Sequence, residues 1–270
     1  MTDANAESVA VLIEGGLDPR EARWLVEEFG PDTEALRDAA LRRRNGEPLQ
    51  YVIGHWPFRS LDLNVDERAL IPRPETEELV SVALSELLRL EVGEPLLVDL
   101  GSGSGAIGLA LLDELRTLGV AARLVAVDES TDALALAQEN ALKHELTQVT
   151  FVHSWWFDDV DASLQGEVDL IVANPPYVGS EEFAELDPVL LYEPKGAIVA
   201  PDGQGVTGFA DLEIIITQAM TWLRPGGVLV CEHANTHRDA VLRAATSAGF
   251  SDVRDVDDLA GHPRVLVARR

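Results

Sequence analysis

The segment Asn174-Pro175-Pro176-Tyr177 has the clearest capacity for chemistry in this sequence. The side-chain oxygen of Asn174 and the carbonyl of Pro175 can each accept an N–H bond from a planar amide or amine, and proline fixes the direction of that carbonyl. The Tyr177 ring can stack on the same flat group. An amide nitrogen is a weak nucleophile, so alignment and polarisation would supply most of its acceleration. We expect Asn174, Pro175, Pro176 and Tyr177 to be catalytic, although Asn-Pro and Pro-Pro are also ordinary turn dipeptides.

A second segment, Gly101-Ser102-Gly103-Ser104-Gly105, lies between an apolar strand-like run and an apolar helix start. Glycine lets the backbone approach a ligand closely, and the N–H groups of a helix start can receive a carboxylate such as that of S-adenosylmethionine. Asp128, at the end of the next strand, can accept hydrogen bonds from two ribose hydroxyls. Asp99, before the first glycine, could receive a positively charged amino group. Together these residues predict a site for S-adenosylmethionine.

The same glycines also satisfy the dinucleotide-binding pattern, as Gly103-x-Gly105-x-x-Gly108. An acid follows that pattern after about 20 residues, and Asp128 meets this condition as well. The glycines alone therefore do not separate a methyl donor from NAD, and a simple tight turn is a third interpretation. Asp99 favours the methyl donor, because NAD does not require an acid at that position.

Strand-like and helical patterns alternate after residue 75. Strands are predicted at residues 96–100, 124–128, 149–153, 168–173, 228–232, 252–256 and 264–268. Such alternation is typical of a parallel sheet covered by helices on both faces. We therefore predict the α/β class, with a doubly wound, mostly parallel, seven-stranded sheet of Rossmann-like type. Ligand-binding loops of such a sheet lie at the carboxyl ends of its strands, so the two segments described above are expected to converge there.

The chain before this sheet shows two other patterns. Apolar residues recur at helical spacing as far as Arg44, and an alternating pattern follows near residues 61–65. We therefore divide the chain into a small N-terminal helical domain (1–50), a hairpin connector (51–74) and a catalytic domain (75–270).

Composition narrows the possible classes of function. The formal charge of −26 repels phosphate backbones, so direct binding of duplex nucleic acid is not expected; the acidity itself could reflect solubility or a saline or GC-rich host. Cys231 is the only cysteine, which excludes an intrachain disulfide and a clustered-thiolate zinc site. No stretch reaches the roughly 18 apolar residues of a membrane span, and the N-terminus does not resemble a signal peptide. We expect a cytoplasmic protein without a membrane partner.

Several separate segments from about Gly46 onward resemble, in order, the signatures of bacterial release-factor glutamine N5-methyltransferases. They are Gly46-Glu47-Pro48-Leu49-Gln50-Tyr51, Leu70-Ile71-Pro72-Arg73-Pro74-Glu75-Thr76-Glu77, Asp99-Leu100-Gly101-Ser102-Gly103-Ser104-Gly105-Ala106-Ile107, Asn174-Pro175-Pro176-Tyr177 and Tyr192-Glu193-Pro194. Adenine N6-methyltransferases share the Asn-Pro-Pro-Tyr tetrapeptide, whereas the Ile-Pro-Arg-Pro-Glu-Thr-Glu stretch is more particular to the glutamine enzymes. The helical domain is shorter than is usual in that family, and His237 stands where glutamine is common.

This resemblance implies a class I methyltransferase fold and an S-adenosylmethionine-dependent protein-glutamine N5-methyltransferase. Its substrate would be the Gly-Gly-Gln loop of a peptide-chain release factor, docked by the helical domain. The resemblance assigns the cofactor to Gly101, Ser102, Gly103, Ser104, Gly105, Asp128, Trp156 and Asn174, and the glutamine to residues 174–177. Three alternatives stay open: a glutamine of a ribosomal protein, N6 of adenine in nucleic acid, and a translation-associated binding protein without turnover.

Other segments have simpler interpretations beside the functional ones. Trp155 is expected in the core and Trp156 beside the adenine. Residues 73–77 either cover the site or simply begin a helix. Residues 178–208 exceed a plain connection, so we expect a substrate-binding lid, with disorder as the alternative. No metal site is expected, because the histidines near residue 235 straddle a strand-to-helix junction.

Overall fold

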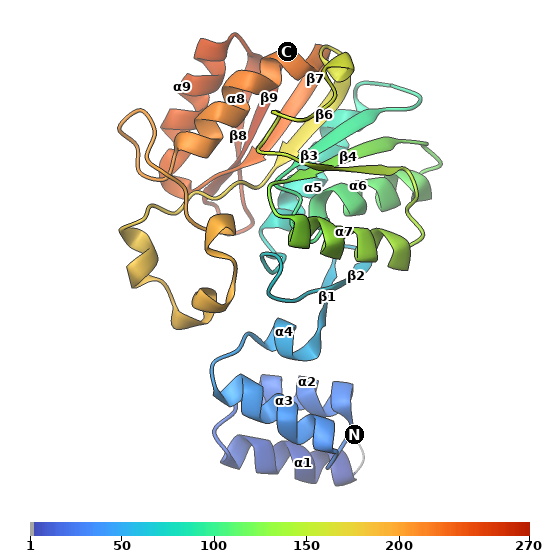
Figure 1. Ribbon diagram of the computed structural model, residues 1–270, viewed down its shortest axis with the longest axis vertical. Coiled ribbons are helices and arrows are strands. Elements are labelled where there is room, and N and C mark those ends of the chain that lie inside the picture. The colour runs from blue at the N-terminus through green and yellow to red at the C-terminus, as the bar shows by residue number, and fades with distance from the viewer. Residues whose placement is uncertain (1–2) are drawn as a thin grey trace.

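The computed structural model describes residues 3–270 of the chain. Its N-terminal part is a bundle of three helices, α1 (Asp3–Glu14), α2 (Pro19–Phe29) and α3 (Glu34–Arg44). Asp18 accepts hydrogen bonds from the first-turn N–H groups of α2, and Thr33 does so for α3, which satisfies donors that a helix start leaves unpaired. These helices pack on a small apolar core of their own, and Figure 1 shows them below the rest of the molecule.

The connector is a short helix followed by a hairpin. Helix α4 (Leu49–Ile53) precedes strands β1 (His55–Phe58) and β2 (Leu61–Asn64), which pair antiparallel. Residues 51–53, which were assigned to the predicted hairpin connector (51–74), are therefore helical instead. Gly54 ends the helix in a left-handed conformation, and the side chains of Leu49 and Val52 pack in the core of the helical bundle, which explains the difference.

A seven-stranded sheet forms the rest of the protein, with the strand order β5-β4-β3-β6-β7-β9-β8. The strands are β3 (Leu96–Leu100), β4 (Arg123–Asp128), β5 (Val149–His153), β6 (Val168–Ala173), β7 (Leu223–Glu232), β8 (Ser251–Asp257) and β9 (Pro263–Arg269). The five strands from β5 to β7 are parallel, and β9 runs antiparallel between β7 and β8. This topology confirms the predicted α/β class and mostly parallel sheet.

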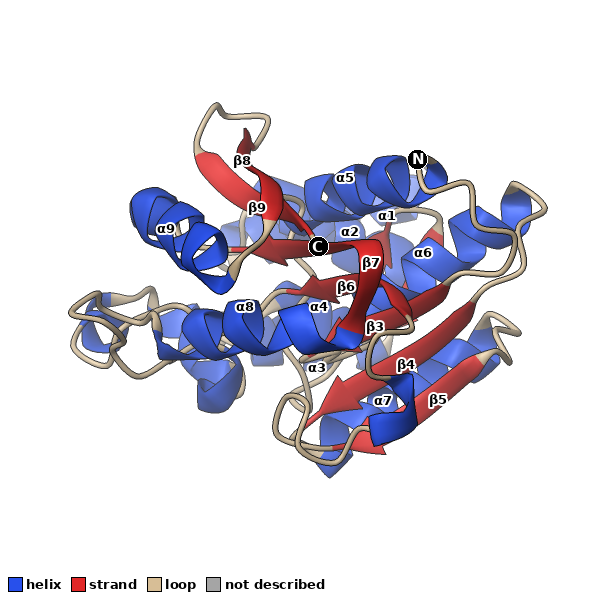
Figure 2. Ribbon diagram, turned by 90° about the horizontal axis from the view of Figure 1, so that it is seen from above, coloured by secondary structure: helices blue, strands red, loops and turns tan. Residues whose placement is uncertain are grey.

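Helices cover both faces of the sheet (Figure 2). Helices α5 (Thr76–Leu88), α6 (Ala106–Thr117) and α7 (Thr131–Lys143) contribute to one apolar core, and α8 (Ala210–Trp222) and α9 (Arg238–Ala248) to the other. Side chains of β3 point to the two faces of the sheet alternately. Leu97 packs in the first core, while Val98 and Leu100 pack in the second. This alternation is the reason why the strands are apolar throughout.

The carboxyl ends of three central strands lie level with one another. Leu100 of β3 is in register with Val127 of β4 on one side and with Ala173 of β6 on the other. The loops that follow β3, β4 and β6 consequently emerge at a single edge of the sheet, at a point where the order of the strands reverses. Open α/β sheets bind ligands at this position.

The segment 178–208 projects from the same edge and contains three short 3-10 turns, η2 (Glu182–Glu185), η3 (Pro188–Tyr192) and η4 (Lys195–Ala197). Figure 1 shows it, in gold, reaching from the sheet towards the N-terminal bundle. The Tyr192 hydroxyl donates to the carbonyl of Asn45 at 2.8 Å. None of the helices in residues 3–270 combines the length and apolar character that crossing a bilayer demands.

Candidate active site

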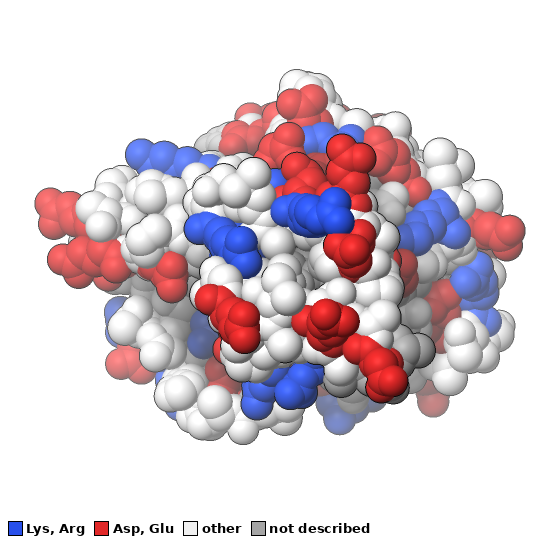
Figure 3. Space-filling model, turned by 90° about the horizontal axis from the view of Figure 1, so that it is seen from below, with Lys and Arg blue, Asp and Glu red and all other residues white. Residues whose placement is uncertain are grey.

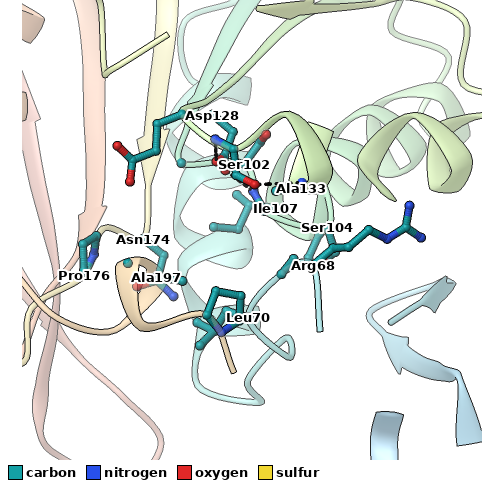
Figure 4. A pocket seen from close by; sticks show the side chains of 18 of the residues that line it. Arg68, Leu70, Ser102, Ser104, Ile107, Asp128, Ala133, Asn174, Pro176 and Ala197 are labelled. Atoms are coloured by element: carbon teal, nitrogen blue, oxygen red, sulfur yellow. Dashed lines mark hydrogen bonds between the residues drawn. The ribbon is translucent and has the colours of Figure 1, made fainter. Parts of the chain in front are cut away.

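A cavity of about 380 Å³ lies where the loops after β3, β4 and β6 meet the start of α5. Figure 4 shows Ser102, Ser104 and Asp128 at one part of its wall and Asn174, Pro176 and Ala197 at another. Other lining residues come from the segment that leads into α5, from the loops after β4 and β5, and from the projecting segment, and include Arg68, Arg73, Thr76, Glu129, Trp155, Trp156, Pro194 and Val199. The two segments that the sequence singled out thus meet in one cavity.

The backbone of the glycine loop explains its composition. Gly101, Gly103 and Gly105 have φ angles of 68°, 54° and 83°, a left-handed region that other residues rarely adopt. Ser102 and Ser104 lie between them, and both line the cavity. Gly105 is buried away from the cavity at the N-cap of α6, where an added Cβ would lie 2.8 Å from Leu109. The loop therefore presents backbone and two serines to a ligand.

Gly108 has a packing role. Its N–H donates to Asp99 Oδ2 at 2.9 Å, and an added Cβ would lie 2.8 Å from that oxygen and 2.7 Å from a methyl of Leu124. The third glycine of the dinucleotide pattern is therefore required by contact between α6 and the sheet. Asp99 itself is fully buried behind the loop and does not line the cavity.

Two buried polar atoms at this loop, Asp99 Oδ1 and Ser102 Oγ, have no hydrogen-bond partner within residues 3–270. Buried polar groups are normally paired, so unpaired ones beside a glycine cradle point to a ligand. A carboxyl group, a hydroxyl and the free N–H groups of a helix start match the amino and carboxylate groups of a methionine moiety. The residues present thus fit S-adenosylmethionine.

Burial, with a smaller contribution from the charge of Asp128, raises the pKa of Asp99 to about 7, and the bond from Gly108 opposes this shift. The native state therefore keeps this proton at pH values where the unfolded chain, with a pKa near 3.8, has released it. The resulting contribution to stability is fully present below pH 3.8 and is lost as the pH rises to about 7.

We expect Asp99→Asn to remove this pH dependence, because the amide does not ionise. The free energy of unfolding of the variant minus that of the wild type should rise by roughly 1.4 kcal/mol for each pH unit inside the window. Urea unfolding of both proteins at several pH values between about 4 and 7 measures this difference in free energy. The titration of groups that both proteins share cancels in the difference. A difference that stays constant across these pH values would contradict the assignment of the shift to Asp99.

Asp128 ends β4 and lines the cavity. Its Oδ2 accepts from the N–H of Gly103 at 2.8 Å, and its Oδ1 accepts from the N–H of Ser130 at 2.9 Å. Burial raises the pKa of this carboxyl, while those backbone bonds oppose the shift. Asp128 is thus held at the rim of the glycine loop, with lone pairs left to accept bonds from a ligand.

Of the two neighbouring tryptophans, Trp155 differs from the prediction, whereas the role of Trp156 stays a prediction. Trp155, expected in the core, is 45% exposed. Trp156, expected beside a ligand, is 8% exposed and belongs to the core under α8, although it also lines the cavity. Its φ of 47° and its bond from Nε1 to Asp211 at 3.2 Å turn the ring inward, which leaves Trp155 facing outward. Both residues line the cavity.

The Asn-Pro-Pro-Tyr segment follows β6 directly. Asn174 and Pro176 line the cavity, while Pro175 is buried and Tyr177 packs against the core under α8. The Tyr177 hydroxyl donates to Glu232 Oε1 at 3.4 Å. Burial, followed by the charge of Glu232, raises the pKa of Tyr177 to about 12, so Tyr177 stays protonated at neutral pH and is not a base.

Sequence reasoning did not assign a role to Thr76 or to Glu232. Asn174 Nδ2 donates to Thr76 Oγ1 at 3.2 Å, and Thr76 Oγ1 donates to Glu232 Oε2 at 2.8 Å. Residues 73–77 were expected either to cover the site or to begin a helix, and they do both. Thr76 begins α5, and it lines the cavity together with Arg73. The Ile-Pro-Arg-Pro-Glu-Thr-Glu stretch contains Thr76 and could have indicated a role for it. The only feature of the sequence that could have indicated a role for Glu232 is its position at the end of a strand.

A buried glutamate joins the projecting segment to the residues before α5. Glu193 is 5% exposed; it accepts a bond from the N–H of Ile71 at 2.9 Å and forms an ion pair with Arg73. Pro194, which follows it, lines the cavity. The expectation of a lid stays a prediction, and these contacts hold part of the segment at the mouth of the cavity. Within residues 3–270, no group of three or more His, Cys, Asp or Glu side chains is arranged to hold a metal ion.

Comparisons with known proteins agree with this geometry. A family model described as a methyltransferase domain matches residues 95–259. The chain is 37% identical to the release factor glutamine methyltransferase of Pasteurella multocida over 246 residues, which cover 87% of this chain and 80% of that protein. The chain belongs to the release factor glutamine methyltransferase family. It is accordingly an S-adenosylmethionine-dependent methyltransferase, as the sequence predicts.

Another member of the release factor glutamine methyltransferase family, from Aliivibrio fischeri, is 36% identical over 99% of this chain and 91% of its own length. This match includes the N-terminal helices, which the resemblance from Gly46 onward left aside. Among solved structures, a methyltransferase from Pyrococcus furiosus superposes with a TM-score of 0.54 at 15% identity, over 77% of this chain and 88% of that one. That likeness is one of fold.

Proposed function

We propose that this enzyme methylates the side-chain amide nitrogen, N5, of the glutamine in the Gly-Gly-Gln motif of peptide-chain release factors. One observation carries the proposal: Asn174 lines the cavity with its Nδ2 bonded to Thr76. Its Oδ1 makes no hydrogen bond within residues 3–270 and stays available to accept one. A glutamine amide offers two N–H groups in one plane, and Asn174 Oδ1 with the Pro175 carbonyl would accept them.

Asn174, Pro175, Pro176 and Tyr177 act by orientation in this proposal. Two accepted N–H bonds fix the plane of the substrate amide, aim the nitrogen lone pair and favour positive charge on that nitrogen. Tyr177 keeps its proton and contributes ring surface. Placing the reacting atoms about 3 Å apart in line would supply most of the acceleration.

S-adenosylmethionine, when bound, supplies an electrophilic methyl group on a sulfonium. We assign it to the residues that the sequence named: Asp99, Gly101, Ser102, Gly103, Ser104, Gly105, Asp128, Trp156 and Asn174. The free N–H groups and Ser102 would take its carboxylate, Asp99 its amino group, and Asp128 its ribose. Of these nine, all but Asp99 and Gly105 line the cavity.

A release factor as substrate implies a reaction in the cytoplasm, and we assign its docking to residues 1–50. The other planar nitrogens that fit the same acceptors are adenine N6 and a ribosomal-protein glutamine. The charge of −26 opposes a nucleic-acid substrate, and on the face seen in Figure 3 basic side chains are interspersed with acidic ones. Protein glutamine is therefore the better supported substrate.

The direct test is methylation with a tritiated donor. We expect label on release factor, at the glutamine of its Gly-Gly-Gln motif, when purified enzyme, donor and substrate are combined and the product is mapped by mass spectrometry. A release factor whose motif glutamine is replaced by alanine is the matched control and should take no label. Label on DNA, RNA or a ribosomal protein, with none on release factor, would favour the other substrates, and donor binding without any label would favour a binding protein.

A further inference from the structure

A chain of three side chains leads from the sheet to Asn174. Glu232, at the end of β7, accepts a bond from the Thr76 hydroxyl at 2.8 Å, and that hydroxyl accepts one from Asn174 Nδ2 at 3.2 Å. Thr76 is 4% exposed and Glu232 is 2% exposed, so water does not readily replace either partner. Asn174, at the far end, is the only one of the three that is not buried.

The fold places these three residues together from distant parts of the sequence. Strands β6 and β7 are parallel neighbours, with Ala173 in register with Cys231, so the next residues, Asn174 and Glu232, leave the sheet at the same level. Helix α5 crosses over this edge and begins with Thr76. The hydroxyl at its first residue therefore lies between the two strand ends.

Burial raises the pKa of Glu232, while the bond from Thr76 and the charge of Arg264 oppose the shift. With Glu232 ionised, counting hydrogens fixes the direction of every bond in this chain. A carboxylate only accepts, so Thr76 must use its single hydroxyl hydrogen on Glu232. The Thr76 oxygen can then only accept from Asn174, which requires Nδ2, and not Oδ1, on that side. If the Asn174 amide were reversed, its Oδ1 would face the Thr76 oxygen, and neither atom could donate. Its Nδ2 would then face an N–H of the substrate amide, and neither group could accept. Each mismatch leaves a buried polar group unpaired, which is costly.

We infer that Thr76 and Glu232 are positioning residues that fix the orientation of the Asn174 amide, so that Oδ1 faces the substrate nitrogen. This inference rests on the proposed role of Asn174. Glu232 also accepts a bond from the Tyr177 hydroxyl with its other oxygen, so it is linked to both ends of the Asn-Pro-Pro-Tyr segment, directly to Tyr177 and through Thr76 to Asn174. Neither positioning residue needs to touch substrate in order to act.

The test compares variants of Thr76 in the full-length enzyme with release factor as substrate. Thr76→Val keeps the shape but removes the hydroxyl, and we expect kcat to fall at least about tenfold because the acceptor is no longer fixed. Thr76→Ser keeps the hydroxyl and should stay within about threefold of the wild type. Thr246→Val, on α9, removes a hydroxyl that bonds only to the Leu242 carbonyl and is the matched control.

Glu232→Gln is a second, independent variant of the same size. Its amide can donate to Thr76, which frees the threonine hydrogen to bond Asn174 Oδ1 and turns the Asn174 amide round. We expect kcat to fall while the dissociation constant of S-adenosylmethionine stays within about threefold, which also shows that the protein is folded. A positioning role predicts this separation, whereas general loss of structure would weaken the donor as well.

A double variant separates this inference from the proposed function. If Thr76 acts only through Asn174, then Thr76→Val should cause no further loss of kcat in an Asn174→Ala background, because residues that act as a unit are not additive. Full kcat in Thr76→Val or Glu232→Gln, an equal loss in Thr76→Ser, or an additive loss in the double variant would overturn the inference. Absence of release-factor methylation by the wild type would instead remove the proposed function.

Discussion

Replacing Asn174 with alanine should lower kcat for release-factor methylation by about a thousandfold, the upper end of what is lost when one preorganised polar group is removed from an active site. The alanine takes away the acceptor that orients the substrate amide and leaves the Pro175 carbonyl alone to hold it. Affinity for S-adenosylmethionine should fall less than in the Asp128 variant described below. Steady-state kinetics together with calorimetric titration of the donor measures both quantities.

Asn235→Ala is the matched control for this experiment. Asn235 is exposed in the loop after β7, so its loss should leave kcat at the wild-type level. An Asn174→Ala enzyme as active as this control would show that the substrate amide is oriented by other groups.

Replacing Asp128 with alanine should weaken the binding of S-adenosylmethionine by roughly two to four orders of magnitude. Each hydrogen bond to a charged group contributes about 1.5–3 kcal/mol, and the ribose would lose two of them. The variant also lacks the carboxylate oxygen that accepts a hydrogen bond from the Gly103 N–H at 2.8 Å. The glycine loop therefore loses one of the hydrogen bonds that hold it. Calorimetric titration gives the dissociation constant, and kcat at saturating donor should fall much less.

Asp132→Ala removes the same charge from an exposed position in the first turn of α7. Donor binding should be unchanged in this control, which separates the contact made by Asp128 from its general electrostatic field. Equal donor affinity in the two aspartate variants would rule out the ribose assignment.

The sheet could be predicted closely because its strands are short apolar runs separated by clear helical patterns. The predicted strands at residues 96–100, 149–153 and 168–173 agree with β3, β5 and β6. The convergence of the two loops also followed from the sequence, since parallel strands end at one edge. Strand identity and loop position are local properties, so a sequence shows them directly.

The parts that could not be predicted depend on contacts between distant residues. Helix α4 has only five residues, which are too few to show the helical spacing of apolar residues in the sequence. It forms because its apolar side chains complete the core of the helical bundle. The exposure of Trp155 follows from the left-handed conformation of the next residue, Trp156. Thr76 and Glu232 are 156 positions apart, and only the strand order brings them to Asn174.

The proposed role of the Asn-Pro-Pro-Tyr segment depends on residues that lie outside the segment. In the proposed mechanism the segment supplies the acceptors, and the buried bonds beyond Asn174 decide which atom of its side chain meets the substrate. Chemistry at a weak nucleophile depends on such preorganisation, because a small misplacement costs about a hundredfold in rate. The strand-end glutamate and the first residue of α5 are in this respect part of the design of the site.

A crystal structure of the enzyme with S-adenosylhomocysteine and a peptide containing Gly-Gly-Gln tests the central claim most directly. We predict that the glutamine side-chain nitrogen lies within hydrogen-bonding distance of Asn174 Oδ1 and of the Pro175 carbonyl, in the cavity at the carboxyl edge of the sheet. A glutamine amide bound elsewhere, or an Asn174 side chain turned away from it, would contradict the account.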